Sequence, residues 1–307
     1  MPRLTTRRLV RGARRGFTLT ELIVTLSLLG VVGTIVARLM MDQQRFYQTT
    51  REKLVIRREM RTALSTIPAD LRSISSVGGD ISSFNDTQIT FRGTYGTAII
   101  CAKPSATTLD LPPTDMARTT LAAWYTPPAV GDSIFAFRTD SMGAGGDSWT
   151  AHRITSVSQN VSYCPASPFI DAVLDAAKAR WRVTVTPAVA DSVKVGAPIR
   201  LVRSMKYELV TGTSGKYYLG RAEYSGGAWG ASTPIAGPFT APAAAGQVGG
   251  LQFTMQDSTG AIINPVGNAL SVSRIDVRLR GSGTSSAGAT KSPKDSLVFR
   301  IALRNRQ

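Results

Sequence analysis

The sequence predicts an α+β protein, in which one long N-terminal helix precedes a mainly antiparallel β-sheet domain. The first observation is the segment 42–67, which contains no glycine or proline and repeats apolar residues at helical intervals. The second is a series of short segments after residue 76, rich in β-branched and aromatic residues and separated by glycine, proline, serine and aspartate. The chain has 307 residues, of which 43% are hydrophobic, so it is long enough to bury a core.

A single helix is expected from Phe17 to Thr66, about 75 Å long at the standard rise per residue. Its first half is apolar on every side, because the sixteen residues 22–37 carry no charge, and its second half is amphipathic. Pro68 is expected either to end the helix or to kink it. The glycines of "SVGGD" (76–80) end it in either case.

The rest of the chain is expected to form strands with one buried and one solvated face. In "RWRVTVTP" (180–187) and "SRIDVRLRG" (273–281), apolar residues alternate with arginine and other polar residues. A short helix is also expected at 167–180, where Ser167 would cap it and Pro168 suits its first turn. The expected strands are 87–93, 97–103, 132–138, 149–157, 180–187, 199–211, 216–224, 250–257, 273–281 and 296–306.

Much of the basic excess lies at the N-terminus. Lysine and arginine number 36 against 20 aspartates and glutamates, a formal net charge of +16 that favours anionic partners such as lipid head groups or nucleic acid. Without the first sixteen residues the charge would be +10 and spread along the chain. Those sixteen residues contain six bases and no acid: Arg3, Arg7, Arg8, Arg11, Arg14 and Arg15.

The two cysteines, Cys101 and Cys164, both follow the apolar segment, so they would share a compartment if that segment entered a membrane. The chain has one histidine and no C-x-x-C, which favours a disulfide over a metal site or a redox pair. The bridge would close a span of 63 residues and contribute about 4 kcal/mol by a loop-entropy estimate. Two separate buried thiols are the alternative.

The apolar segment has three interpretations. It could be a secretory signal cut before Arg38, which would release a soluble protein. It could be an uncut membrane anchor, although sixteen residues are slightly short for a span and residues 39–41 would have to lengthen it. Neither interpretation accounts for Glu21, because a lone carboxylate entering hydrocarbon is costly.

The third interpretation rests on "RRGFTLTELIVTLSLLGVV" (14–32), which resembles the N-terminus of type IV pilins and type II secretion pseudopilins. The shared features are a basic leader ending in glycine, then phenylalanine, then Thr-Leu-x-Glu at the head of an apolar helix. The resemblance implies that a membrane aspartic peptidase cuts between Gly16 and Phe17 and that the same class of enzyme methylates the new amine of Phe17. It also implies that Glu21 meets the terminal amine of a neighbouring subunit in a filament, which would compensate the buried carboxylate.

This resemblance implies a chain inserted once in the bacterial inner membrane and later assembled into a pilus or pseudopilus. The six N-terminal bases should keep the N-terminus cytoplasmic and place the head in the periplasm. The expected parts are a leader (1–16) that is removed, a transmembrane segment (17–41), an amphipathic stem (42–75) and a β-rich head (76–307). The expected partners are other pilins, the prepilin peptidase and methyltransferase, an inner-membrane assembly platform and membrane lipid.

Within the family the chain is most similar to large minor pilins of the PilW-like and pseudopilin-J groups. Its last strand, "SLVFRIALRNR" (296–306), resembles the ending of the PilW-like group, and "MKYELVTGTSGKYYLGRAEY" (205–224) resembles a hairpin of both groups. It departs from many major pilins by having no proline between residues 17 and 67, and its cysteines lie centrally rather than near the C-terminus. A minor subunit of a type IV pilus is expected, with a minor pseudopilin of a type II secretion system as the alternative.

Two other classes of function are alternatives, an anchored enzyme and a DNA-binding module. A membrane-anchored periplasmic enzyme would need catalytic residues, but His152 has no acid within four positions and no hydrolase, zinc-protease or nucleotide-binding motif occurs. "GAGGDS" (143–148) is expected to be a flexible loop and "QDSTGAIIN" (256–264) a turn, so no catalytic residue, cofactor or metal is expected. DNA binding is the remaining alternative. It would use a stripe of Arg274, Arg278, Arg280, Arg300, Arg304 and Arg306.

Overall fold

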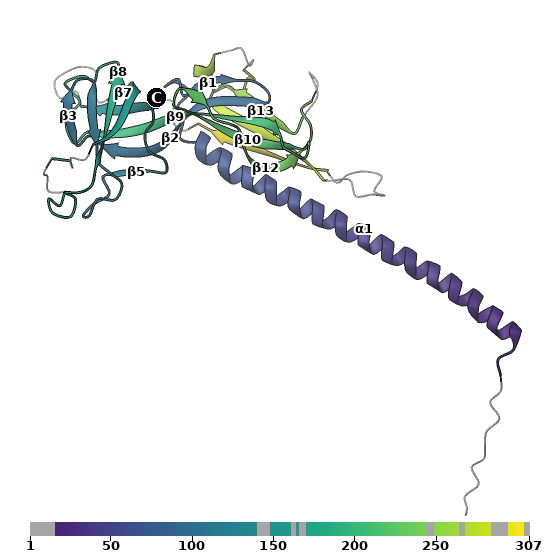
Figure 1. Ribbon diagram of the computed structural model, residues 1–307. Helices are drawn as coiled ribbons and strands as arrows, with labels where there is room; N and C mark the ends of the chain where they lie inside the picture. The colour runs from purple at the N-terminus through teal and green to yellow at the C-terminus, as the bar shows by residue number, and fades with distance from the viewer. Residues whose placement is uncertain are drawn as a thin grey trace, which may run out of the picture.

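The structure is a computed structural model that describes residues 16–139, 148–160, 164–165, 170–243, 249–263, 268–283 and 294–303. These residues form one long α-helix and fifteen strands in a single sheet system whose pairings are antiparallel (Figure 1). The predicted α+β fold is therefore confirmed. The elements are α1 Leu19–Leu71, β1 Ile81–Phe84, β2 Gln88–Ile99, β3 Ala102–Ser105, β4 Thr108–Leu111, β5 Ala122–Trp124, β6 Ser133–Arg138, β7 Ser148–Asn160, β8 Arg180–Thr186, β9 Pro198–Thr211, β10 Tyr217–Ser225, β11 Ala228–Trp229, β12 Thr233–Phe239, β13 Leu251–Gln256, the short 3-10 helix η1 Ala269–Ser271, β14 Arg274–Ser282 and β15 Lys294–Ala302.

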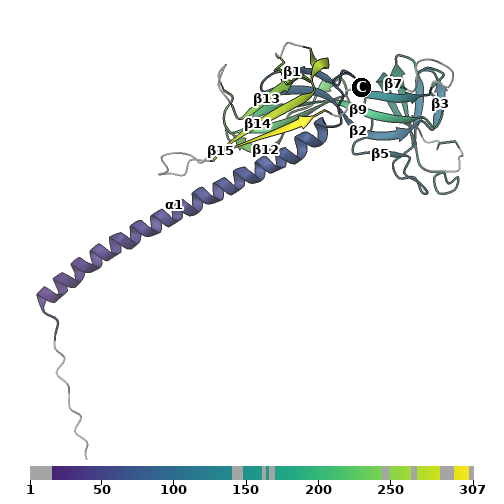
Figure 2. The ribbon, with the colours of Figure 1, turned by 180° about the vertical axis from the view of Figure 1, so that it is seen from behind.

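Helix α1 is 53 residues long, about 80 Å, and most of it projects from the head (Figures 1 and 2). Every residue from 16 to 48 is exposed. The helix runs through Pro68 to Leu71, so Pro68 does not end it, and its end lies five residues beyond the expected Thr66. Burial of Ile67 and Leu71 against the head stabilises the last turn although Pro68 has no N–H to donate.

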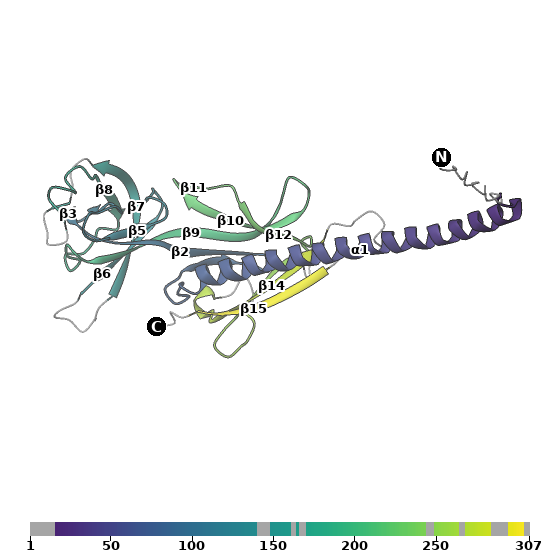
Figure 3. The ribbon, with the colours of Figure 1, turned by 90° about the horizontal axis from the view of Figure 1, so that it is seen from below.

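The head has two lobes that share two long strands (Figure 3). The helix-proximal lobe contains β1, β10 and β12–β15, and the distal lobe contains β3–β8. Strand β9 joins the lobes, because residues 199–202 pair with β6 and residues 205–211 pair with β10. Strand β2 pairs with β9 along almost its whole length, with one register shift between Thr94 and Gly96.

The C-terminal part of α1 packs on β12, β14 and β15 of the helix-proximal lobe. Ile56 and Met60 lie so close to β14 that a Cβ on Gly281 would be 2.1 Å from the Cγ2 atom of Ile56, so this position requires glycine. A polar contact adds to the apolar ones, because the Tyr207 hydroxyl donates to Asp70 of α1 at 2.6 Å. The buried residues of α1 are Ile56, Met60, Ala63, Ile67, Pro68 and Leu71.

The predicted alternation is present where it was clearest. Ile275, Val277 and Leu279 of β14 are fully buried, as is Val183 of β8, whereas the arginines between them are only partly buried. The expected strands 87–93 and 97–103 were wrongly divided. Strand β2 is continuous from Gln88 to Ile99, and a separate strand, β3, begins at Ala102. Strands β1, β4, β5, β11 and β12 were missed, and β12 (TPIAGPF) contains two prolines, which weaken a strand pattern.

The helix expected at 167–180 is wrong in the part that the structure describes, where residues 172–177 form turns and none of residues 170–179 is helical. Side-chain carboxylates satisfy the backbone of these turns. Asp171 accepts from the N–H groups of Val173 and Leu174 at 3.0 Å each, and Asp175 accepts from that of Asp171 at 2.9 Å. The side chains of Val173 and Leu174 are exposed and pack on nothing in the described part of the chain, whereas Ile170 is buried against the two cysteines. Ser167 and Pro168 lie outside the described residues.

A buried ion pair lies where the two lobes meet. Arg203 of β9 donates to both carboxylate oxygens of Asp132, at 2.8 and 2.7 Å, and the Asp132 side chain is completely buried. The Tyr95 hydroxyl of β2 donates to the same carboxylate at 2.8 Å, and the guanidinium carbon of Arg203 lies 4.4 Å from the centroid of the Tyr95 ring. Burial, with the neighbouring Asp132 charge, raises the pKa of Tyr95 far above its usual value. The network therefore joins β2, β9 and the start of β6.

Candidate functional site

The predicted cleavage site lies just outside helix α1. Gly16 and Phe17 are in an exposed, non-helical segment, and 79% of the Phe17 surface is accessible. Thr18 has an extended backbone and caps the helix, which begins at Leu19. Because the peptide bond between Gly16 and Phe17 is outside the helix, a peptidase could bind it without unwinding a helical turn.

Glu21 lies in the first turn of α1, next to the cap. Its backbone N–H donates to the Thr18 hydroxyl at 3.3 Å, and that hydroxyl lies 3.4 Å from a carboxylate oxygen of Glu21. The Thr-Leu-Thr-Glu sequence has the capping-box pattern, and in the structure Thr18 caps the N–H of Glu21 while the carboxylate contacts the Thr18 hydroxyl. A carboxylate near a helix N-terminus is also favoured by the helix dipole. Sequence reasoning missed the role of Thr18, although the spacing of a threonine and a glutamate three residues apart was visible.

No basic side chain among the described residues forms an ion pair with Glu21, which makes hydrogen bonds with Thr18 and Thr25. The turns that follow expose large apolar side chains on every side of the helix. This stretch is long and apolar enough to cross a membrane, and its apolar part is entirely unburied. Such a surface is stable only in lipid or against other helices.

Comparison with known families bears on this helix directly. The family model of the prokaryotic N-terminal methylation motif matches residues 11–37. This is the signature of type IV pilins and pseudopilins. The matched segment contains Gly16, Phe17 and Glu21, and the motif in general implies processing by a prepilin peptidase and assembly with other pilins. No curated protein and no solved structure matched the chain.

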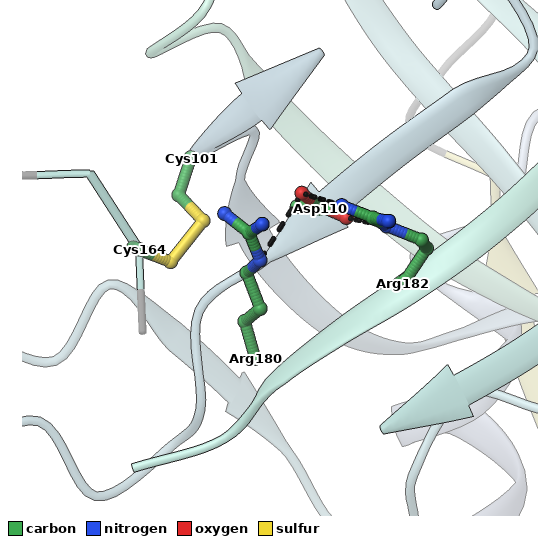
Figure 4. The surroundings of a disulfide bond; sticks show 5 residues. All are labelled: Cys101, Asp110, Cys164, Arg180 and Arg182. Carbon is green, nitrogen blue, oxygen red and sulfur yellow. Dashed lines mark hydrogen bonds and ion pairs between the residues drawn. A yellow bond between two sulfur atoms is a disulfide. The ribbon is translucent and has the colours of Figure 1, made fainter. Parts of the chain in front are cut away.

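The head of this pilin-like chain contains the predicted disulfide. Cys101 and Cys164 are bonded, with their Cα atoms 5.7 Å apart, and both are buried with Ile170. Beside the bond, the buried Asp110 of β4 pairs with Arg182 and Arg180 of β8 at 2.8 and 3.2 Å (Figure 4). The disulfide therefore ties the segment before Ile170 to the edge of the distal lobe.

We expect replacement of both cysteines by serine to lower the free energy of unfolding by roughly 4 kcal/mol, because the bridge restricts a 63-residue loop of the unfolded chain. Denaturant titration of the double variant, compared with the native protein with and without reductant, would measure the loss. The reduced native protein should match the variant. A variant as stable as the oxidised native protein would contradict this expectation.

The methylation motif is typical of structural proteins. The one histidine of the chain, His152, is buried and hydrogen-bonded. The side chain is 4% exposed on β7, and its Nδ1 atom donates to the carbonyl of Pro187 at 2.8 Å. Its Nε2 atom lies 2.8 Å from the Thr150 hydroxyl. Both ring nitrogens are thus engaged by neighbouring polar groups, and no carboxylate orients the imidazole as in a catalytic dyad.

The structure describes one of the two loops, 256–264 and 143–148, that were examined for ligand-binding residues, up to Ile263. Asp257 accepts hydrogen bonds from the Thr259 hydroxyl at 2.7 Å and from the N–H groups of Thr259 and Ala261, which lower the pKa of its carboxyl. This segment is a turn, as expected. The glycine-rich loop at 143–148 lies outside the described residues except for Ser148. Within the described part of the chain, no three His, Cys, Asp or Glu side chains are grouped to hold a metal ion.

The arginine stripe considered for DNA is partly compensated by an acid. Asp276 of β14 lies 3.2 Å from Arg274 and 3.6 Å from Arg300 of β15. This carboxylate would repel phosphate at the centre of the stripe. Arg304 and Arg306 lie outside the residues that the structure describes.

Proposed function

We propose that the chain is a prepilin that matures into a minor subunit of a type IV pilus. A peptidase removes residues 1–16, and the new amine of Phe17 is methylated. Glu21 then pairs with the terminal amine of a neighbouring subunit during assembly. The methylation motif at residues 11–37, placed at the head of an exposed apolar helix, is the observation that carries this proposal.

In this proposal the parts of the chain have separate mechanical roles. Residues 17–41 anchor the subunit in the inner membrane, residues 42–75 form the stem, and residues 76–307 form a periplasmic head. The continuous helix α1 and its docking on the helix-proximal lobe support such an arrangement, because a stem fixed to the head transmits force along its axis. An inner-membrane assembly platform would extract the subunit and place the stem in the filament.

A minor pseudopilin of a type II secretion system is the second candidate. The segment that resembles a pseudopilin-J hairpin, residues 205–224, lies in an antiparallel hairpin of β9 and β10. The length of 307 residues and the lack of a proline in α1 before Pro68 support a minor rather than a major subunit in either system. A low-copy subunit of this kind would initiate or cap a filament.

Mass spectrometry of the N-terminus of the native protein tests the proposed processing. We expect the first residue to be Phe17 carrying one methyl group. An N-terminus at Arg38 would instead identify a secreted soluble protein, and an intact Met1 would identify an uncut anchor; either result would contradict the proposal. Substitution of Gly16 by a bulky residue such as leucine should block cleavage and leave the leader attached.

A further inference from the structure

One face of the stem is basic and points away from the head. It consists of Tyr47, Arg51, Leu54, Arg58 and Arg61, called here the arginine face, which are all exposed. Their spacings of four, three, four and three residues place them in one row along the helix, as at the seam of a coiled coil. Among the described residues, none of these three arginines has a salt-bridge partner.

Two acids of the stem, Glu59 and Asp70, point the other way. Glu59 accepts from the N–H of Gly237 in β12 at 3.3 Å, and Asp70 accepts from the Tyr207 hydroxyl. The buried residues of α1, such as Ile56 and Ala63, lie on this side too, opposite Leu54 and Arg58. The stem therefore places Glu59 and Asp70 against its own head, whereas Arg51, Arg58 and Arg61 face outward.

A second copy of the chain cannot pair through its own arginine face. Two such faces side by side would bring guanidinium groups together, which disfavours packing of like subunits along this row. The outward apolar members, Tyr47 and Leu54, have 72% and 62% of their surfaces accessible and are suited to burial against another helix. A helix with apolar residues and carboxylates at heptad spacing would complement both the arginines and the exposed apolar side chains of this face.

The position of the arginine face favours a protein over lipid head groups. Arg58 and Arg61 lie 17 and 20 residues beyond Met41, which is about 25–30 Å along a continuous helix. This exceeds the Debye length of about 8 Å at physiological salt, so a membrane surface attracts these charges only weakly when the stem stands upright.

We propose that the arginine face binds the acidic stem of a different subunit that also carries an N-terminal methylation motif. The inference rests on the proposed function, since it assumes that stems pack side by side in a filament, and it specifies the charge of the neighbour. The charge pattern selects a sister subunit over a second copy, so it limits self-assembly and fixes where the chain can join the filament.

Photo-crosslinking from the arginine face in cells tests this inference. Leu54 is replaced by p-benzoylphenylalanine in the full-length chain, and the same replacement at Leu174, an exposed leucine of the distal lobe, is the matched control. We expect the Leu54 variant to crosslink to a second chain with a methylation motif and carboxylates in the facing stem segment. The Leu174 variant should not give this product.

Charge reversal tests whether the contact depends on the arginines. The double variant Arg58→Glu, Arg61→Glu should lower the crosslink yield roughly tenfold or more, because like charges would then face each other. The control Arg153→Glu, Lys194→Glu makes the same change in net charge at exposed positions of the distal lobe and should leave the yield unchanged. Replacing two facing carboxylates of the partner by arginine should restore the yield of the reversed variant.

Three outcomes would overturn the inference. A crosslink from Leu54 to a second copy would show self-packing, a crosslink to phospholipid would show membrane contact, and a yield insensitive to reversal would show that the arginines do not select the partner. Incorporation into sheared filaments or a pseudopilus fraction is measured in the same cells. If the chain is absent from both, the proposed function fails; if it is incorporated but one of the three outcomes occurs, only the present inference fails.

Discussion

Substitution of Glu21 by alanine is expected to abolish incorporation of the subunit into a filament while leaving the head folded. The carboxylate lies in the first turn of an exposed apolar helix and has no cationic partner among the described residues. In a filament it would be enclosed by neighbouring helices, where an unpaired charge is strongly unfavourable and a paired one is tolerated. The proposed partner, the amine of Phe17 in a neighbouring subunit, exists only after cleavage.

The measurement is the amount of subunit in sheared filaments or, for a secretion pseudopilus, the secretion of substrate. Asp42→Ala is the matched control, because Asp42 is an exposed acid of the same helix that pairs with Arg45 at 3.7 Å. Its removal should leave assembly normal. The Glu21→Ala protein in detergent should unfold at the same temperature as the native protein, since Glu21 contacts no residue of the head.

Glu21→Gln separates the charge from the cap. Glutamine can still serve in the capping box with Thr18 but cannot form an ion pair with an amine. We therefore expect Glu21→Gln to assemble as poorly as Glu21→Ala. Normal assembly of the glutamine variant would assign Glu21 to helix capping alone and would contradict the pairing mechanism.

The features that could be predicted are those encoded in local sequence. The apolar and amphipathic halves of α1 each repeat with helical periodicity, and the segment from Gly16 to Glu21 is a contiguous motif. The disulfide was also predictable, because only two cysteines are present and one pairing is possible.

The features that were missed depend on contacts between distant residues. The turns at 172–177 replace the expected helix because two aspartates bind backbone N–H groups, and one of them, Asp175, also accepts from the N–H of Ala117 across the lobe. The helix continues through Pro68 because its neighbours are buried by strands that lie far away in sequence. No local sequence pattern carries this information. At these positions tertiary packing overrides the local helix propensity.

The buried network of Asp132, Arg203 and Tyr95 is the most consequential of these distant contacts. Asp132→Ala is expected to lower the free energy of unfolding by at least about 4 kcal/mol. The variant would leave the Arg203 guanidinium, which is 5% exposed, without its carboxylate, and it would leave the Tyr95 hydroxyl without its acceptor. Denaturant unfolding of the full chain in detergent, followed by fluorescence, reports on this change because all four tryptophans lie in the head.

Glu223→Ala is the matched control for this prediction. Glu223 also pairs with Arg203, at 3.2 Å, but its side chain is 28% exposed, so water can replace much of the interaction and the loss should be about 1 kcal/mol or less. Equal losses in the two variants would show that burial of the Asp132 pair is not the main cause.

A triple variant distinguishes the cost of an unpaired charge from the value of the pair itself. Asp132→Leu, Arg203→Met and Tyr95→Phe together remove the two buried charges and the Tyr95 hydroxyl and keep similar side-chain volumes. Because isolated charges are costly to bury whereas apolar replacements of the same shape are not, the triple variant should recover most of the stability that Asp132→Ala loses. If it is less stable than Asp132→Ala, the ion pair contributes net stability where β2, β9 and β6 meet.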